Sequence, residues 1–343
     1  MLNFTPAWSR LHARLAPPPT LFECAAEVVE LEPGSTREVP PAIALPGEID
    51  RVQSFYADAA AHRSRLTEST RIEGPTLAYR LDDAVLADFT VYAGGTHQVY
   101  RPGRKRPLLV GTPSTIDEAQ LCTTACIETY FGHFLRDGLP LELLAQERSL
   151  APLYFERPSW LHEPGYRELV GMWPTTTRHA RVGKLWLVDE TALNAGWVRR
   201  TREIRRRIGE QVQPTPDTHV FLLRGRMAEA RELVNQRQLA EELERRGFRV
   251  IEPERMDVPC ICAALAGAKV VTCVEGSAQN HAFMAMPSGA ALLSIQPPDR
   301  FNSIPKLIAD ALGIRFAYVV PDARAGGFDL DPARFMRTLE LLD

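Results

Sequence analysis

The pair His133 and Asp137 is the first candidate for chemistry in this sequence. The two residues are four positions apart between Gly132 and Gly138, so helical geometry would place them on one face. A carboxylate beside an imidazole raises the basicity of the ring and fixes its tautomer, as a general base requires. Such pairs also arise by chance, so a purely structural pair stays open.

Two arginines, Arg224 and Arg226, follow the apolar run His219–Leu223. At the carboxyl end of a parallel strand, two guanidinium groups would form a bidentate clamp for a diphosphate. The alternative is a pair of surface arginines, since arginine is abundant in this chain. The expected burial of the strand favours the clamp.

A strand–loop–helix pattern spans residues 269–286. The run Lys269–Cys273 leads to Glu275 and then to Gly276, Ser277 and Ala278, before an apolar helical pattern. Glycine lets the backbone approach a ligand, and the free N–H groups at a helix start favour an anion. We expect Glu275 either to accept hydrogen bonds from ribose or sugar hydroxyls or to form an ion pair with Arg224 or Arg226. His281 would reach the same ligand or lie in the core.

The order of elements predicts an α/β fold. Residues 77–100 alternate apolar and polar side chains and indicate an antiparallel β-meander, whereas the proline-rich residues 1–75 indicate an irregular segment. From residue 219 onward, strands and helices alternate, as in a parallel sheet with helices on both faces. Asn235 and Gln238 form a capping-box pattern at one helix start. The remaining predicted strands are 108–110, 153–155, 184–188, 219–223, 248–251, 269–273, 291–295 and 315–319, and the predicted helices are 117–130, 197–208, 236–246, 259–266 and 304–312.

Composition limits the class of protein. With 343 residues the chain suits two domains, and its formal net charge of −3 argues against a dedicated nucleic-acid binder. No apolar run has the length of a membrane span, and no signal-like core is present, so we expect a cytoplasmic protein. The six cysteines lack zinc-site spacing, which favours buried thiols over a metal centre. The basic residues 199–207 predict either a solvated helix face or contact with an anionic acceptor or lipid phosphate.

Three sequence blocks resemble glycosyltransferase family 61, which includes bacterial capsular-polysaccharide-type enzymes. Residues 132–140 look like the family's Gly-His-Trp-Leu-x-Asp-x-Leu-Pro block, with Phe134 in place of the tryptophan. Residues 224–239 look like its Arg-Arg and Asn-Glu-x-x-Leu block, with Gly225 between the arginines. Residues 271–289 look like its strand, glycine loop and Phe-Met-Pro block, in the version of the bacterial branch.

The resemblance implies a GT-B-like fold of two facing Rossmann-like domains. With the pattern above, it suggests an irregular segment 1–75, an acceptor-side domain 76–212 that carries the meander, and a donor-side domain 213–343 with a parallel doubly wound sheet. It implies an inverting, metal-independent glycosyltransferase that uses a nucleotide sugar, UDP-linked by preference, and needs no cofactor. By position, His133 and Asp137 would be catalytic and face the acceptor across the cleft. The donor-binding residues would be Arg224, Arg226, Asn235, Glu275, Gly276, Ser277, Ala278 and His281.

Two other functions fit the same residues. A non-catalytic nucleotide-sugar-binding or scaffold subunit of a polysaccharide assembly would keep the arginines and the loop but need no base. A pyruvyl transferase would share the fold with a different donor. The expected partners are a saccharide or glycoconjugate acceptor and no nucleic acid. A homo-oligomer and peripheral contact with the inner membrane are both compatible with the sequence.

Overall fold

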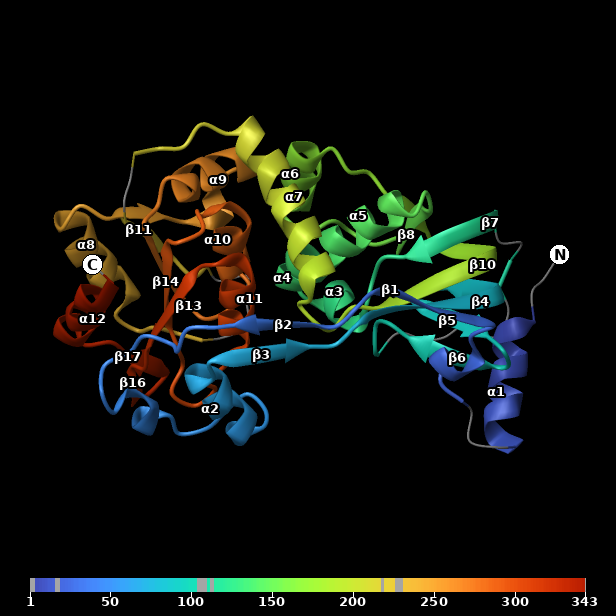
Figure 1. Cartoon of the computed structure of the whole chain (residues 1–343), viewed down its shortest axis with the longest axis horizontal. Coiled ribbons are helices and arrows are strands. Elements are labelled where there is room, and N and C mark those ends of the chain that lie inside the picture. Colours follow the sequence, from blue (N-terminus) through green and yellow to red (C-terminus); the bar gives the residue numbers. More distant parts are fainter. Residues whose placement is uncertain are drawn as a thin grey trace. The chain divides into compact units, whose positions relative to one another are not determined.

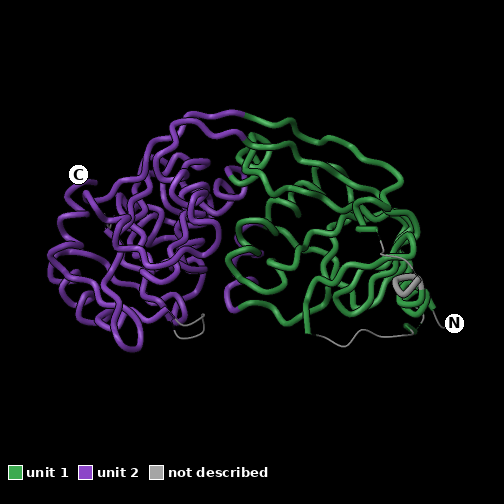
Figure 2. The backbone as a smooth tube through the Cα atoms, turned by 90° about the horizontal axis from the view of Figure 1, so that it is seen from below, with its two compact units in different colours: residues 1–35, 73–160, 171–201 green, residues 36–72, 161–170, 202–343 purple. Residues whose placement is uncertain are grey.

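The computed structural model describes residues 4–15, 19–103, 110–111, 114–216, 219–225 and 231–342. They form two compact units, each assembled from three separate stretches of the chain (Figure 2). Unit 1 comprises residues 1–35, 73–160 and 171–201, and unit 2 comprises residues 36–72, 161–170 and 202–343.

Unit 1 is built on an eight-stranded mixed sheet with the order β6-β5-β4-β10-β7-β8-β9, and β1 pairs with β4 (Figure 1). The strands β4, β5 and β6 form the predicted antiparallel meander, which is thereby confirmed. The strands β10, β7, β8 and β9 pair in parallel. The elements are α1 (Thr5–Leu15), β1 (Glu27–Glu32), β4 (Thr76–Ala87), β5 (Thr90–Ala93), β6 (Thr96–Val99), β7 (Ser114–Leu121), α3 (Ala125–Thr129), α4 (Phe131–His133), a π-helical turn (Phe134–Gly138), α5 (Leu139–Glu147), β8 (Ala151–Phe155), β9 (Thr175–Thr177) and β10 (His179–Asp189).

The helix predicted over residues 117–130 is wrong. This segment is the strand β7 followed by the short helix α3. β7 pairs with β10 on one side and β8 on the other, and its residues Ala119 and Leu121 are buried. Pairing on both sides of a central strand outweighs local helical preference. Of the strand predicted at 108–110, residues 108 and 109 lie outside the described residues.

Unit 2 contains a five-stranded parallel sheet with the order β12-β11-β13-β14-β15. The helices α8 and α12 contribute to the core on one face, while α9, α10 and α11 are neighbours on the other. The predicted parallel, doubly wound sheet is therefore confirmed. The elements are β2 (Ser35–Glu38), α2 (Ala59–Thr67), β3 (Thr70–Glu73), α6 (Glu163–Val170), β11 (His219–Leu222), α8 (Gln236–Arg245), β12 (Arg249–Ile251), α9 (Val258–Ala266), β13 (Val270–Val274), α10 (Gln279–Ala285), β14 (Ala291–Ile295), α11 (Ile304–Leu312), β15 (Arg315–Val319), β16 (Asp322–Arg324), β17 (Gly327–Asp329) and α12 (Pro332–Leu339).

Residues 1–75 are more ordered than the prolines indicated. They contain α1, β1, β2, α2 and β3, and the stretch 36–72 belongs to unit 2. Pro40 and Pro41 fall between β2 and the bridge of Ile43 to Ala317 of β15. A proline breaks a ladder only where its missing N–H is needed, so the flanking residues still form elements.

The basic segment lies on the helix α7 (Ala195–Gln211), and the division between the units falls within it, after Thr201. Its arginines have partners inside the protein. The fully buried Arg200 pairs with Glu190, and the Arg205 guanidinium donates to backbone carbonyls of residues 283 and 286. Arg199, Arg206 and Arg207 also form ion pairs with glutamates. Arg199 and Arg206, whose side chains are both 55% exposed, fit the predicted solvated helix face, whereas Arg200 and Arg205 are held by partners in the interior.

A second buried ion pair lies in unit 2. The Lys306 ammonium, on α11, contacts the Asp310 carboxylate at 2.6 Å, and neither side chain is more than 4% exposed. Burial raises the pKa of Asp310 despite this partner. Breaking such a pair leaves an uncompensated charge in the core.

Candidate active site

Arg224 and Glu275 follow adjacent strands of the parallel sheet in unit 2. Arg224 comes two residues after β11, and Glu275 comes directly after β13. The next strand in the chain after β11, β12, lies on one side of it, whereas β13 lies on the other. The carboxyl ends on either side of such a reversal are where open α/β sheets bind ligands.

The Glu275 carboxylate is the centre of a polar cluster. Its Oε2 accepts from Arg231 at 2.5 Å and from Arg300 at 3.3 Å, and its Oε1 accepts from Asn302 at 2.9 Å. Its side chain is 6% exposed. Both carboxylate oxygens are engaged, so Glu275 holds the arginines in place and the expectation that it accepts from sugar hydroxyls is not favoured by this geometry.

Arg224 joins the same cluster through the main chain. Its Nη1 donates to the Glu275 carbonyl oxygen at 3.0 Å, and Arg231 donates to that oxygen at 3.1 Å. The side chain of Gln236 bonds both the N–H of Arg224, at 2.9 Å, and its carbonyl, at 3.2 Å. Gly276 has a φ of +149°, and a Cβ there would lie 2.2 Å from Arg224 Nη1, so an alanine at this position would displace that guanidinium group. We call Arg224, Arg231, Arg300 and Glu275 the arginine cluster.

A series of hydrogen bonds between buried polar side chains leads from Gln279 to Asn302, which bonds Glu275. Ser294 donates to Gln279 at 3.1 Å, and Gln296 donates to Ser294 at 2.9 Å. The Gln296 side-chain oxygen then accepts from the Asn302 N–H at 3.0 Å. Because Asn302 also bonds Glu275, this network fixes the carboxylate from the strand β14.

Four further residues predicted to bind the donor are Arg226, Asn235, Ser277 and Ala278. Arg226 lies outside the described residues. Ser277 and Ala278 form the loop between Glu275 and α10, with partly exposed side chains. Asn235 precedes α8 but makes no capping bond; instead its side chain donates to the Leu330 carbonyl at 2.8 Å and accepts from the Leu330 N–H at 3.2 Å. The capping box is therefore wrong, because tertiary bonds to Leu330 take the amide.

His281 packs against Tyr166 and His162 in unit 2. Its Nδ1 is 2.8 Å from the Tyr166 hydroxyl, and its ring meets that of His162 edge to face at a centroid distance of 4.9 Å. Burial, and then the neighbouring His162, lower the pKa of His281 to about 3. The ring is thus a neutral core group, the structural alternative that the sequence left open.

In unit 1, His133 ends α4 and Asp137 lies in the π-helical turn that follows. The predicted pairing is confirmed, since Nδ1 of His133 is 2.6 Å from Oδ2 of Asp137. Arg136 holds the same carboxylate with two bonds, at 2.7 and 2.8 Å. Burial alone would raise the pKa of Asp137, but Arg136 and the bond to His133 outweigh it and hold the pKa below its usual range.

These contacts assign different roles within the pair. An ionised carboxylate can only accept a hydrogen bond, so the 2.6 Å contact with Asp137 favours the tautomer with its proton on His133 Nδ1, an atom that also lies 2.8 Å from Arg136 Nη2. In that tautomer Nε2 is the atom that can accept a proton, and no hydrogen bond to it is seen among the residues with described positions. Asp137, whose pKa is lowered, is a poor base. The geometry therefore favours His133 as the base and Asp137 as the group that orients it.

Two side chains hold the carbonyls of the π-helical turn. The Trp197 indole donates to the Arg136 carbonyl at 3.1 Å, and the Tyr154 hydroxyl donates to the Gly138 carbonyl at 3.0 Å. A π-helical turn lacks regular i→i−4 bonds, so such donors stabilise it. They also fix the backbone that carries the His–Asp pair.

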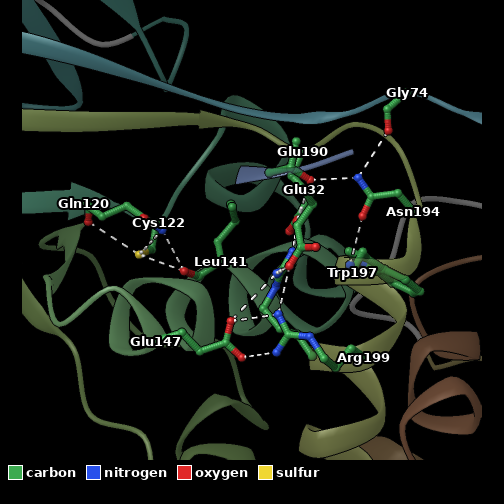
Figure 3. Close-up of polar contacts among 12 residues, drawn as sticks. Glu32, Gly74, Gln120, Cys122, Leu141, Glu147, Glu190, Asn194, Trp197 and Arg199 are labelled. Atoms are coloured by element: carbon green, nitrogen blue, oxygen red, sulfur yellow. Dashed lines mark hydrogen bonds and ion pairs between the residues drawn. The ribbon is translucent and has the colours of Figure 1, made fainter. Parts of the chain in front are cut away.

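The helix α7, which carries Trp197, also carries Arg199 and Arg200, and Figure 3 shows the contacts of Arg199 with Glu147 and Glu32. Arg199 bonds Glu147 and Glu32, at 2.5 and 2.9 Å, while Arg200 pairs with Glu190. Burial raises the pKa of Glu190 to about 7, although Arg200 and a hydrogen bond from Thr76 lower it. Asp137 also raises this pKa, so Glu190 is electrostatically coupled to the candidate catalytic pair.

Sequence reasoning missed four members of the unit 2 site: Arg231, Gln236, Arg300 and Asn302. Arg300 and Asn302 follow the predicted strand 291–295, so a search beyond each strand end would have found them. Gln236 stands inside the block that resembles the family's Asn-Glu-x-x-Leu motif. Nothing in the spacing of Arg231 marks it, since it is brought to Glu275 by the loop between β11 and α8.

Within the described residues, no three or more His, Cys, Asp and Glu side chains are grouped so as to hold a metal ion. No described helix has the length and apolar character needed to cross a membrane.

Fold and site together define an α/β protein with an arginine cluster at the ligand-binding edge of a parallel sheet. Residues 131–293 match the family model Glycosyltransferase 61. The matched stretch, which is slightly less than half of the chain, contains His133, Asp137, Arg224 and Glu275, and over these residues the chain is similar to the glycosyltransferases of this family. No curated protein matches the chain.

Proposed function

We propose that the protein transfers a sugar from a nucleoside-diphosphate sugar to a hydroxyl group of a saccharide or glycoconjugate. The observation that carries this proposal is the arginine cluster. Two guanidinium groups, of Arg231 and Arg300, contact the Glu275 carboxylate, and that of Arg224 donates to the Glu275 main-chain carbonyl, so positive charge exceeds negative charge among these four side chains. A diphosphate is the anion that such a surplus suits.

The proposed reaction is a direct displacement at the anomeric carbon. His133 Nε2 takes the proton of the acceptor hydroxyl as the acceptor oxygen forms its bond to that carbon. The bond from the carbon to the donor phosphate breaks, and the electron pair leaves with the nucleoside diphosphate. A single displacement of this kind inverts the anomeric configuration. The arginine cluster stabilises the charge that develops on the leaving group.

The proposal includes a metal-independent mechanism and a GT-B-like arrangement, with the donor bound by unit 2 and the acceptor by unit 1. Guanidinium groups supply the charge that a divalent cation supplies in other transferases. The family match and the parallel sheet of unit 2 support this assignment. UDP-sugars are the first donors to test, in a bacterial polysaccharide or capsule context.

Ligand-dependent thermal unfolding tests the donor site. UDP, GDP, ADP, CMP and their sugar conjugates are titrated with and without EDTA. A ligand at about 100 times its Kd stabilises the folded state by about 2.7 kcal/mol, a shift of several degrees in Tm. We expect one nucleoside diphosphate to stabilise the wild type with EDTA present. Arg224→Ala should abolish the shift, whereas the exposed control Arg245→Ala should retain it. A wild type that responds to no nucleotide contradicts the proposal.

Turnover measurements separate the transferase from the scaffold subunit. His133→Asn should lower kcat by at least 100-fold while the Kd for the donor stays unchanged, because His133 acts on the acceptor hydroxyl. Full transfer activity in this variant excludes the base role. If the wild type binds a nucleoside diphosphate but transfers no sugar to any acceptor, the scaffold interpretation replaces the enzyme. A pyruvyl transferase would be revealed by transfer from phosphoenolpyruvate.

A further inference from the structure

The N-terminal stretch 36–72 contributes a short extended segment to the ligand-binding edge of unit 2. The Gln53 N–H donates to the Pro298 carbonyl at 2.7 Å, and the Tyr56 N–H donates to the Phe301 carbonyl at 2.9 Å. Phe55 and Phe301 form a parallel β-bridge. These bonds attach the segment to the loop after β14, the loop that carries Arg300.

Side-chain packing holds this segment rigidly. The Phe55 ring contacts the Phe301 ring edge to face at 5.7 Å and stacks on the His62 ring at 5.9 Å. His62, which is buried on α2, lies 2.9 Å from the Ser303 hydroxyl. The next residue, Tyr56, is therefore presented from a backbone fixed on both sides.

Tyr56 differs from its neighbours in being exposed. Its exposed fraction is 51%, whereas Phe301 is fully buried. The Arg300 guanidinium carbon lies 4.2 Å from the centroid of the Tyr56 ring, and Arg300 also bonds Glu275 at 3.3 Å. The accessible Tyr56 ring therefore contacts Arg300, which is itself bonded to the central carboxylate of the arginine cluster.

We propose that Tyr56 is the stacking platform for the base of the nucleoside diphosphate. Arg300 contacts the ring at 4.2 Å, and about half of the Tyr56 surface is open to a ligand. A base stacked on this ring would place its diphosphate beside the guanidinium groups that it needs. Stacking on a rigid ring costs little conformational entropy and accepts any base. Single exposed aromatics are common on proteins; what distinguishes this one is its contact with the anion site.

The inference rests on the proposed function, since it assigns a subsite for the same ligand. It gives the stretch 36–72 a part in donor binding, which the sequence did not reveal. It also predicts that base and phosphates are recognised by different residues. Tyr56 contributes affinity for the base, and the arginine cluster contributes affinity for the phosphates.

Calorimetric titration of four proteins tests this division: wild type, Tyr56→Ala, Tyr56→Phe and Trp173→Ala, an exposed aromatic of unit 1. The ligands are inorganic pyrophosphate and the nucleoside diphosphate that stabilises the wild type, the latter both free and as its sugar conjugate. Tyr56→Ala should weaken nucleoside diphosphate binding by about tenfold, the equivalent of about 1.4 kcal/mol. Its affinity for pyrophosphate should stay unchanged. Tyr56→Phe and Trp173→Ala should bind both ligands as the wild type does.

Three results would overturn the proposal. Unchanged nucleoside diphosphate affinity in Tyr56→Ala excludes the platform while leaving the proposed function intact. An equal loss of pyrophosphate affinity shows that Tyr56 acts only by positioning Arg300. A loss confined to the sugar conjugate assigns the ring to the sugar instead. Failure of the wild type to bind any nucleoside diphosphate is the separate outcome that removes the proposed function, and the subsite with it.

Discussion

The substitution Glu190→Gln should remove a loss of folding stability that the wild type shows as the pH rises. The Glu190 side chain is 2% exposed, and burial raises its pKa to about 7 from an ordinary value of 4.5, even though Arg200 and Thr76 contact it. Between these two pH values the folded protein binds more protons than the unfolded chain. Stability therefore falls as the pH rises through this window and is constant above it.

The size of the effect follows from the shift. At about 1.4 kcal/mol per pKa unit, a rise from 4.5 to about 7 corresponds to roughly 3 kcal/mol. This stability is present at pH 4 and absent at pH 8. A glutamine of the same shape has no proton to lose. The free energy of unfolding of Glu190→Gln, relative to wild type, should therefore increase by about 3 kcal/mol from pH 4 to pH 8.

Urea denaturation of wild type and variant at pH 4, 5, 6, 7 and 8 measures this difference. Glu210→Gln is the matched control, because the Glu210 side chain is 56% exposed in a surface pair with Arg206. The control should differ from wild type by a few tenths of a kcal/mol at every pH. A Glu190→Gln difference that is constant across the series, or that shrinks towards pH 8, would refute the reasoning.

Three further substitutions test other parts of the structure. Gly276→Ala should abolish the thermal shift given by pyrophosphate while leaving the unliganded Tm within a few degrees of wild type, since the new methyl group displaces Arg224. Trp197→Phe should lower the free energy of unfolding by about 1–3 kcal/mol in urea denaturation and reduce kcat, because the buried Arg136 carbonyl loses its donor. Lys306→Met should lower the free energy of unfolding by about 3–5 kcal/mol in the same assay, because the Asp310 carboxylate stays buried without its partner. An unchanged result for any of the three variants contradicts the contact on which its prediction rests.

The C-terminal half of the fold could be predicted because its signals are local. Each strand there is a short, mainly apolar run, and the helices between them have apolar stripes, so the alternation is visible without tertiary information. The strand β14 begins and ends at the residues expected, Ala291 and Ile295. In unit 1 the decisive contacts are long-range. β7 becomes a strand because β8 and β10 pair with it, which no local window contains.

The same distinction applies to the site. Arg224 and Glu275 were found because they stand at strand ends, a position defined by the local pattern. Arg231 and Arg300 reach Glu275 from loops, so only the folded chain shows that they share one carboxylate. The burial of His281 against Tyr166 is likewise a tertiary fact, since the partner helix α6 is more than 100 residues earlier.

The interleaving of the two units has a consequence for how the chain is made. The chain passes from one unit to the other five times, at residues 35, 72, 160, 170 and 201. During synthesis, unit 1 cannot be completed until residue 201 has left the ribosome, and residues 36–72 must wait for β14 and β15 before they find their partners. Neither unit can be isolated by truncation, and residues 131–293 alone would omit β4, the strand to which β10 pairs. Separate production of either unit would need its three stretches rejoined by new linkers.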